Sequence, residues 1–177
     1  IHPEPLKRAL PFMDAANLDI KAMSDSFYRE NCGATLAPVL RSAEALKAGG
    51  VWLEITNLVI PDRNDSDRSI RELSRFITKH LGPDTPLHFS RFFPHHKMRN
   101  VPTTPAATLR RAREIAKSEG VRYVYIGNMR RSPDASRTSC SGCGKVLIDR
   151  YGYMVISNHI TQGRCPVCGT LIPGVWG

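Results

Sequence analysis

Two pairs of cysteines near the C-terminus constrain the fold of this chain more than any other feature. Cys140 and Cys143 form one CxxC motif, and Cys165 and Cys168 form a second. This spacing is typical of a tetrahedral metal site built from two turns that flank a β-hairpin. A glycine follows each pair, and a residue without Cβ lets the backbone turn its amide groups toward the sulfurs.

Zinc is the metal that four thiolates favour, because they complete its tetrahedral coordination and leave no position for a catalytic water. We therefore expect a structural site. A single iron, as in rubredoxin, fits the same four sulfurs. Two disulfides are the other alternative, although CxxC pairs in a chain without secretory features are more typical of metal or redox sites. The unpaired Cys32 favours a reducing compartment, and its simplest interpretation is a small buried apolar residue.

The chain has 177 residues and a hydrophobic content of 41%, enough for one domain with a small additional module. It contains no apolar run of membrane-spanning length, and its first residues lack the pattern of a signal peptide. We expect a soluble, cytoplasmic protein with no membrane partner. Because the first residue is isoleucine, we also expect the chain to be part of a longer protein.

The net charge of +9 is concentrated after residue 105. Such an excess predicts, as one alternative function, a basic zinc-ribbon module that contacts nucleic acid or an acidic protein without catalysis. The basic residues are scattered, however, and few aromatic residues lie among them. A solvated surface is the simpler interpretation, so a nucleic-acid partner is not expected.

Strand-like and helix-like segments alternate along the first part of the chain. β-Branched or apolar runs predict strands at 15–20, 51–60, 87–92 and 122–126. Apolar stripes predict helices between them, the first with Pro38 at its first position, the second over about 66–80, and the third capped by Thr104 and ending at Gly120. This alternation indicates a parallel sheet with crossover helices.

The composition changes after the last of these strands. Residues 129–139 are polar and basic and contain a proline, which predicts a linker between residues 1–128 and a module of residues 140–177. Within the module, two alternating segments around Tyr151 and Gly152 predict a hairpin. The sheet of the first part would have an unpaired first strand, and an exposed edge of this kind favours the C-terminal half of a larger barrel.

Several segments, in this order, resemble radical S-adenosylmethionine (SAM) enzymes. Within them the chain is similar to the branch related to pyruvate formate-lyase activating enzymes that is named the AmmeMemoRadiSam system radical SAM enzyme. The segments are NLDIKA (17–22), FYRENCGATLAPVL (27–40), EITNLVIPDRND (54–65), HFSRFFPHHKM (88–98), VPTTP (101–105), YVYIGN (123–128) and the closing CxxCG, RYGY, CPVCG and IPGVW.

The resemblance implies an α/β fold: the C-terminal half of a partial (β/α)6 radical SAM barrel in residues 1–128, with an additional helix and strand, followed by a rubredoxin-like zinc ribbon. It implies reductive cleavage of SAM by a [4Fe–4S] cluster, giving a 5′-deoxyadenosyl radical that abstracts hydrogen from an unknown substrate or protein. The cluster motif CxxxCxxC of this family is absent from these residues. We therefore expect the chain to hold no catalytic residue and to be inactive on its own.

The resemblance also implies contacts with SAM at strand ends. Asp19 and Lys21 form the Asp-x-Lys motif of the activating enzymes, and two residues so spaced on a strand point to one face. There a carboxylate can bind ribose hydroxyls and an ammonium can bind the methionine carboxylate. The alternative is an ordinary ion pair at the end of a strand.

Thr56, Asn57 and Val59 match positions on the next strand that contact the nucleoside, and Phe93 matches the region that approaches adenine. Phe92 or Phe93 is equally suited to the core.

The adjacent His95 and His96 suggest a metal at first sight. Neighbouring residues of an extended segment diverge, so we expect surface or substrate-loop histidines.

Overall fold

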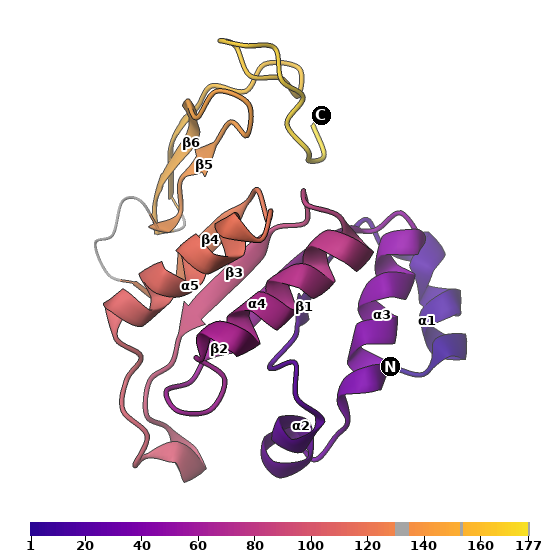
Figure 1. Ribbon diagram of the computed structural model, residues 1–177. Helices are drawn as coiled ribbons and strands as arrows, with labels where there is room; N and C mark the ends of the chain where they lie inside the picture. Colours follow the sequence, from indigo (N-terminus) through magenta and orange to yellow (C-terminus); the bar gives the residue numbers. More distant parts are fainter. Residues whose placement is uncertain (130–134, 153, 177) are drawn as a thin grey trace.

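The computed structural model describes residues 1–129, 135–152 and 154–176, which form an α/β domain and a small C-terminal sheet (Figure 1). The helices are α1 (Pro3–Ala9), α2 (Asp25–Cys32), α3 (Leu36–Ala48), α4 (Asp67–Phe76) and α5 (Ala106–Ser118), with 3₁₀ turns at Leu10–Phe12 and His96–Met98 and a π-helical turn at Ile77–Leu81. The strands are β1 (Ala15–Asp19), β2 (Trp52–Val59), β3 (Leu87–Arg91), β4 (Val124–Gly127), β5 (Thr138–Ser139), β6 (Val146–Tyr151) and β7 (Met154–Asn158).

Strands β1 to β4 form one parallel sheet in the order β1-β2-β3-β4. The predicted strands and their parallel arrangement are confirmed. Among the described residues β1 pairs with β2 alone, so the far edge of β1 is a free edge of the sheet, as the sequence predicted.

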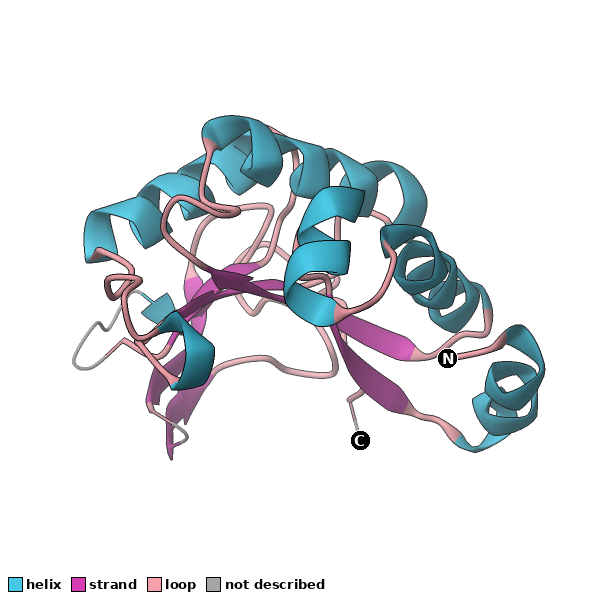
Figure 2. Cartoon of the chain, turned by 90° about the horizontal axis from the view of Figure 1, so that it is seen from below, coloured by secondary structure: helices cyan, strands magenta, loops and turns pink. Residues whose placement is uncertain are grey.

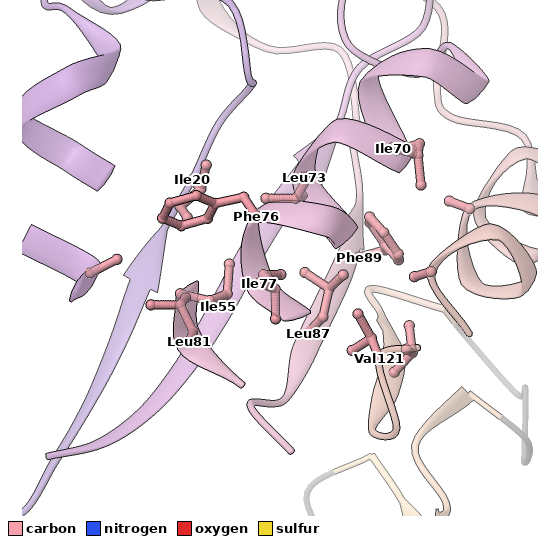
Figure 3. Packing of buried hydrophobic residues seen from close by; sticks show 14 of the residues in the cluster. Ile20, Ile55, Ile70, Leu73, Phe76, Ile77, Leu81, Leu87, Phe89 and Val121 are labelled. Carbon is pink, nitrogen blue, oxygen red and sulfur yellow. The ribbon is translucent and has the colours of Figure 1, made fainter. Parts of the chain in front are cut away.

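Helices cover one face of this sheet (Figure 2). Alternate residues of β2 are buried, and Leu53, Ile55 and Val59 lie in the core with the apolar sides of the helices. In Figure 3, Leu73, Phe76 and Ile77 pack over Ile55 and Leu87 of the strands. The other face of the sheet is half-buried and polar, which is unusual because parallel sheets are normally covered on both faces.

The helices begin and end where their local chemistry allows it. Ser66 caps α4 by accepting a hydrogen bond from the Ser69 backbone N–H. The predicted stripes of α4 and α5 are buried. In α2, Ser24 caps the start, and Gly33 ends the helix in the left-handed conformation at φ 61°.

Two predicted helix starts are wrong. Helix α3 begins at Leu36, so Pro38 is its third residue, where the missing N–H has no intrahelical partner to lose. Pro105, not Thr104, is the N-cap residue of α5. The Thr104 hydroxyl donates to the Val59 carbonyl (2.6 Å) and accepts from the Phe92 N–H (2.9 Å), so it links two strand ends instead.

The C-terminal module has the predicted hairpin, since β6 and β7 are antiparallel neighbours. Strand β5, which lies inside the segment predicted as a linker, pairs with β6 and joins this sheet. Residues 130–134 of that segment lie outside the described residues. No helix in the described part of the chain is long and apolar enough to cross a membrane.

Candidate metal centre and strand-end site

The four cysteines of the two CxxC motifs converge. The Sγ atoms of Cys140, Cys143, Cys165 and Cys168 all lie within 4.8 Å of one another. Two of the separations are 3.5 Å (Cys140 to Cys168) and 3.7 Å (Cys143 to Cys165). Thiolates about 2.3 Å from a tetrahedral ion would be about 3.8 Å apart. This group can therefore hold one metal ion, whereas all five cysteines of the chain are free thiols and form no disulfide.

The two cysteine turns have the same backbone design. The N–H of Gly144 donates to the Cys140 carbonyl and that of Gly169 to the Cys165 carbonyl, both at 2.9 Å. Both glycines have positive φ, 75° and 73°, a conformation that residues with Cβ rarely adopt. The Gly142 N–H lies 3.3 Å from Cys140 Sγ, so a backbone amide points at a sulfur as the sequence suggested.

The thiol pKa values differ within the cluster. Hydrogen bonds from the Thr170 side chain and backbone lower the pKa of Cys168 to about 6. At Cys143 the Lys145 backbone lowers the pKa, but the neighbouring Cys168 thiol and burial outweigh it and raise the pKa to about 12. One thiolate in the cluster thus opposes ionisation of its neighbours, and a bound cation would remove this opposition.

Among the described residues this is the one group of three or more Cys, His, Asp or Glu side chains placed to share an ion. His95 and His96 are exposed beyond β3, in agreement with a surface position. Cys32 is also exposed, so its predicted burial is wrong: it is the last residue of α2, one turn beyond the buried Tyr28, where the helix ends.

A second group of polar residues lies at the carboxyl end of the parallel sheet. Asp19, the last residue of β1, forms an ion pair with Lys21 (Oδ1 to Nζ, 3.1 Å), and their side chains are 50% and 36% exposed. Thr56 is the register partner of Asp19 on β2 and donates to Asn17 Oδ1 at 2.9 Å. Both charges and the threonine hydroxyl are therefore open to a ligand at the strand ends.

The backbone at Lys21 is held by buried amides. The Lys21 carbonyl accepts from Asn64 Nδ2 (2.6 Å) and Asn57 Nδ2 (3.1 Å), and the Lys21 N–H donates to the Tyr28 hydroxyl (3.0 Å). Asn57 and Asn64 are 2% and 3% exposed. The backbone from which the Lys21 side chain projects is thus fixed by residues of three different segments.

The remaining predicted contact residues have different environments. Val59 is fully buried in the core, and its carbonyl accepts from Thr104, so its side chain faces away from the open surface. Phe92 is buried, whereas Phe93 is 50% exposed with the Arg91 guanidinium 5.3 Å from its ring centre. Phe93 is thus the member of the pair that is open to a ligand.

Sequence reasoning missed Asn64 and Tyr28 as parts of this site. Both residues lie inside segments that resemble the radical SAM family, so the resemblance pointed to these segments but not to a role for either residue. The geometry explains their presence, because each fixes the Lys21 backbone rather than offering a free group to a ligand.

The parallel sheet and the helices on one of its faces form a fold that this chain shares with two solved structures. A domain of pyruvate-formate lyase-activating enzyme from Bacteroides vulgatus superposes with a TM-score of 0.61 and 15% sequence identity, over 72% of this chain and 75% of that one. A radical SAM methyltransferase from Sphaerobacter thermophilus gives a TM-score of 0.50 and 16% identity, over 77% of this chain and 41% of that one.

A relative is also found in sequence. Uncharacterized protein MJ0808 of Methanocaldococcus jannaschii is 45% identical over 174 residues, which are 97% of this chain and 51% of that protein. The chain therefore spans about half the length of this relative. No known protein family matches the chain by its sequence profile.

Proposed function

We propose that this chain is the SAM-binding C-terminal half of a radical SAM enzyme of the AmmeMemoRadiSam type, a partial (β/α)6 barrel that carries a zinc ribbon. The observation that supports this most is the Asp19 and Lys21 pair, which stands at the carboxyl end of an edge strand in a radical SAM-like fold. The polar, half-open face of the sheet supports it further, since closure of a barrel would enclose that face.

In this proposal the chain's own residues bind and orient SAM. Asp19 accepts hydrogen bonds from the ribose hydroxyls, and Lys21 binds the methionine carboxylate. Thr56 and Phe93 contact the nucleoside by their side chains, and Val59 can contribute only through its backbone. The cysteines that hold a [4Fe–4S] cluster would come from outside these 177 residues, and the chemistry such a cluster would supply is one-electron reduction of the bound SAM.

The zinc ribbon is proposed for residues 138–176, with zinc held by Cys140, Cys143, Cys165 and Cys168. The sulfur separations support zinc or a single iron alike, and zinc is the commoner choice for a closed site with four cysteines. Five free thiols also support a reducing compartment, the cytoplasm.

We do not extend the proposal to nucleic acid, because many of the basic side chains have acidic partners. Arg71 and Arg75 bind Glu119, Arg111 binds Asp67, and Arg122 binds Asp84.

The proposal is tested by SAM affinity in the longest protein that the gene encodes. Replacing Asp19 by Asn, or Lys21 by Met, should weaken SAM binding about tenfold or more, the usual consequence of losing a charged hydrogen bond. Asp14→Asn changes an exposed aspartate at the opposite end of the same strand and should leave the affinity unchanged. Equal affinities in all four proteins would contradict the proposal.

A further inference from the structure

A cavity of about 390 Å³ lies between the polar face of the parallel sheet and the C-terminal module. Its sheet side comes from the amino-terminal halves of β2, β3 and β4 and the residues that precede them. Its other side comes from β5, β6 and the segment that follows the second cysteine pair. Asp19 and Lys21, by contrast, lie at the carboxyl end of β1. The volume is at the small end of the range for pockets that enclose organic ligands.

Aromatic rings form much of the wall and are held in place. The indole N–H of Trp52 donates to Glu54 (3.2 Å), and that of Trp176 donates to the Ile172 carbonyl (2.8 Å). Trp176 packs against Gly163 and Gly174, where any Cβ would come within 2.8 Å of its ring. The ring of Tyr125 is fixed by a hydrogen bond of 3.0 Å between its hydroxyl and that of Thr138. These rings present apolar surfaces that need little reorganisation to bind a flat molecule.

The charged groups that line the cavity differ in how many hydrogen-bond partners they have. Both carboxylate oxygens of Glu54 have partners, one in Trp52 and the other in His88 Nε2 at 2.8 Å. Burial opposes ionisation of Glu54, but the His88 hydrogen bond outweighs it and lowers the pKa of this carboxyl, so Glu54 is an anion at neutral pH. The imidazole of His88 is in turn stacked on Tyr125, with the ring centres 5.0 Å apart.

Arg150 is the exception. Its guanidinium lines the cavity and lowers the pKa of Glu54 by attraction at a distance, yet in the described ranges it donates no hydrogen bond to another residue. Five donors in a planar fork match a carboxylate in two-point contact. The guanidinium, whose donors are free for a ligand, and the flat apolar walls therefore suit a planar molecule that carries an anionic group.

We propose that this cavity binds a small planar carboxylate, with the carboxylate on Arg150 and the flat body against Trp52, Tyr125 and Trp176. The C-terminal module supplies Arg150 and Trp176, so the bound metal, by folding the module, also assembles this second site. The proposal goes beyond the SAM site and does not depend on it.

The chain offers a direct readout, because its two tryptophans both line the cavity. Benzoate is the probe, and benzamide, which has the same shape without the charge, is its control. We expect saturable quenching of tryptophan fluorescence and a calorimetric signal with benzoate in the metal-loaded chain. Benzamide should bind about tenfold more weakly or worse, as should benzoate to Arg150→Gln.

Arg110→Gln is the matched variant, since it removes an exposed guanidinium from α5, on the helix-covered side of the sheet. It should bind benzoate as the unchanged chain does. Arg150→Lys keeps the positive charge but loses the planar guanidinium, so its benzoate affinity should lie between those of the unchanged chain and Arg150→Gln. This second variant keeps the test valid if Arg150→Gln fails to fold. Far-ultraviolet circular dichroism of each variant checks the fold.

The proposal is overturned if benzoate and 2-naphthoate both fail to bind the metal-loaded chain, or if benzamide binds as well as benzoate. Equal benzoate affinity in Arg150→Gln and the unchanged chain would overturn it too. Benzoate binding should persist in Asp19→Asn, so the outcome here is separate from that of the SAM proposal.

Discussion

Asn64 shows how one buried side chain can organise a binding site. Its Oδ1 accepts from the Ile60 N–H (2.7 Å), and its Nδ2 donates to the carbonyls of Lys21 (2.6 Å) and Leu58 (2.9 Å). Donor and acceptor are both needed in a site with 3% exposure, which only an amide supplies. The residue thus joins the end of β2 to the loop that carries Lys21.

Replacing Asn64 by Ala should lower the free energy of unfolding by about 2 to 4 kcal/mol, because three hydrogen bonds are lost and their buried backbone partners are left without replacements. Urea unfolding followed by circular dichroism measures this. Asn100→Ala, at an exposed asparagine, should change the value by less than about 0.5 kcal/mol. A loss of similar size in both variants would show that the network is not responsible.

Gly144 tests the backbone of the metal centre. Its φ of 75° disfavours any residue with Cβ, and apart from its neighbours in the chain no described atom lies within 4 Å of the place where a Cβ would stand, so the effect of Gly144→Ala is conformational. We expect a cost of about 1 to 2 kcal/mol. Zinc affinity, measured by competition with a chromophoric chelator, should therefore fall about 5- to 30-fold. The neighbouring exposed Lys145→Ala should retain full affinity, and a similar loss there would contradict the argument.

Among the elements, the longer strands and helices were well predicted, whereas the short helices and the two-residue strand β5 were not. The strands were visible as β-branched runs, and α4 and α5 as apolar stripes, because burial of one face imposes a period. Helix α1 was missed since only Leu6 in it is buried and two prolines dominate its sequence. Helix α2 buries only Phe27 and Tyr28, too few residues for a periodic pattern.

The contact between α4 and α5 carries a pH dependence. Hydrogen bonds from Arg75 (2.7 Å) and Arg71 (2.9 Å) lower the pKa of Glu119, which follows the last residue of α5. A carboxyl whose folded pKa is lowered stabilises the fold above its ordinary pKa and loses that contribution as the pH falls through the folded pKa. The packing of α4 against α5 should therefore be less stable at acidic pH.

Glu119→Gln should be less stable than the unchanged chain at pH 7, and this difference should shrink and vanish as the pH falls below the ordinary glutamate range. Urea unfolding at a series of pH values measures the two curves. Glu30→Gln, at an exposed glutamate of α2 with no ion pair in the described part of the chain, should show no such convergence. If Glu119→Gln differed from the unchanged chain by the same free energy of unfolding at every pH, the pH dependence could not be assigned to Glu119.

For the molecule as a whole, the sequence predicted the convergence of the four cysteines but not the cavity between the parallel sheet and the C-terminal module. The cysteine motifs are local and have a characteristic spacing. Trp52, Arg150 and Trp176 come from three distant segments and meet only after the module folds against the sheet. Residues so far apart in the sequence form no local motif, so the cavity could not be predicted from the sequence. The parallel sheet could be predicted, because strands and helices alternate along the chain.

Metal removal should unfold the C-terminal module without unfolding the α/β domain. Metal binding contributes on the order of 10 kcal/mol to folding in small modules of this kind, so a strong chelator should unfold residues 138–176 and leave the four-stranded sheet folded. Hydrogen exchange measured by mass spectrometry should show lost protection in β6 and β7 and retained protection in β2 and β3. Loss in both sheets together would show that they fold as one unit.

The central claim, that these strands belong to a radical SAM enzyme, is tested most directly by its product. The longest protein that the gene encodes should be reconstituted with iron and sulfide without oxygen, reduced, and given SAM. We expect 5′-deoxyadenosine, measured by chromatography and mass spectrometry, to form at a rate that Asp19→Asn strongly reduces and Asp14→Asn leaves unchanged. A protein with a loaded cluster that forms no 5′-deoxyadenosine would contradict it.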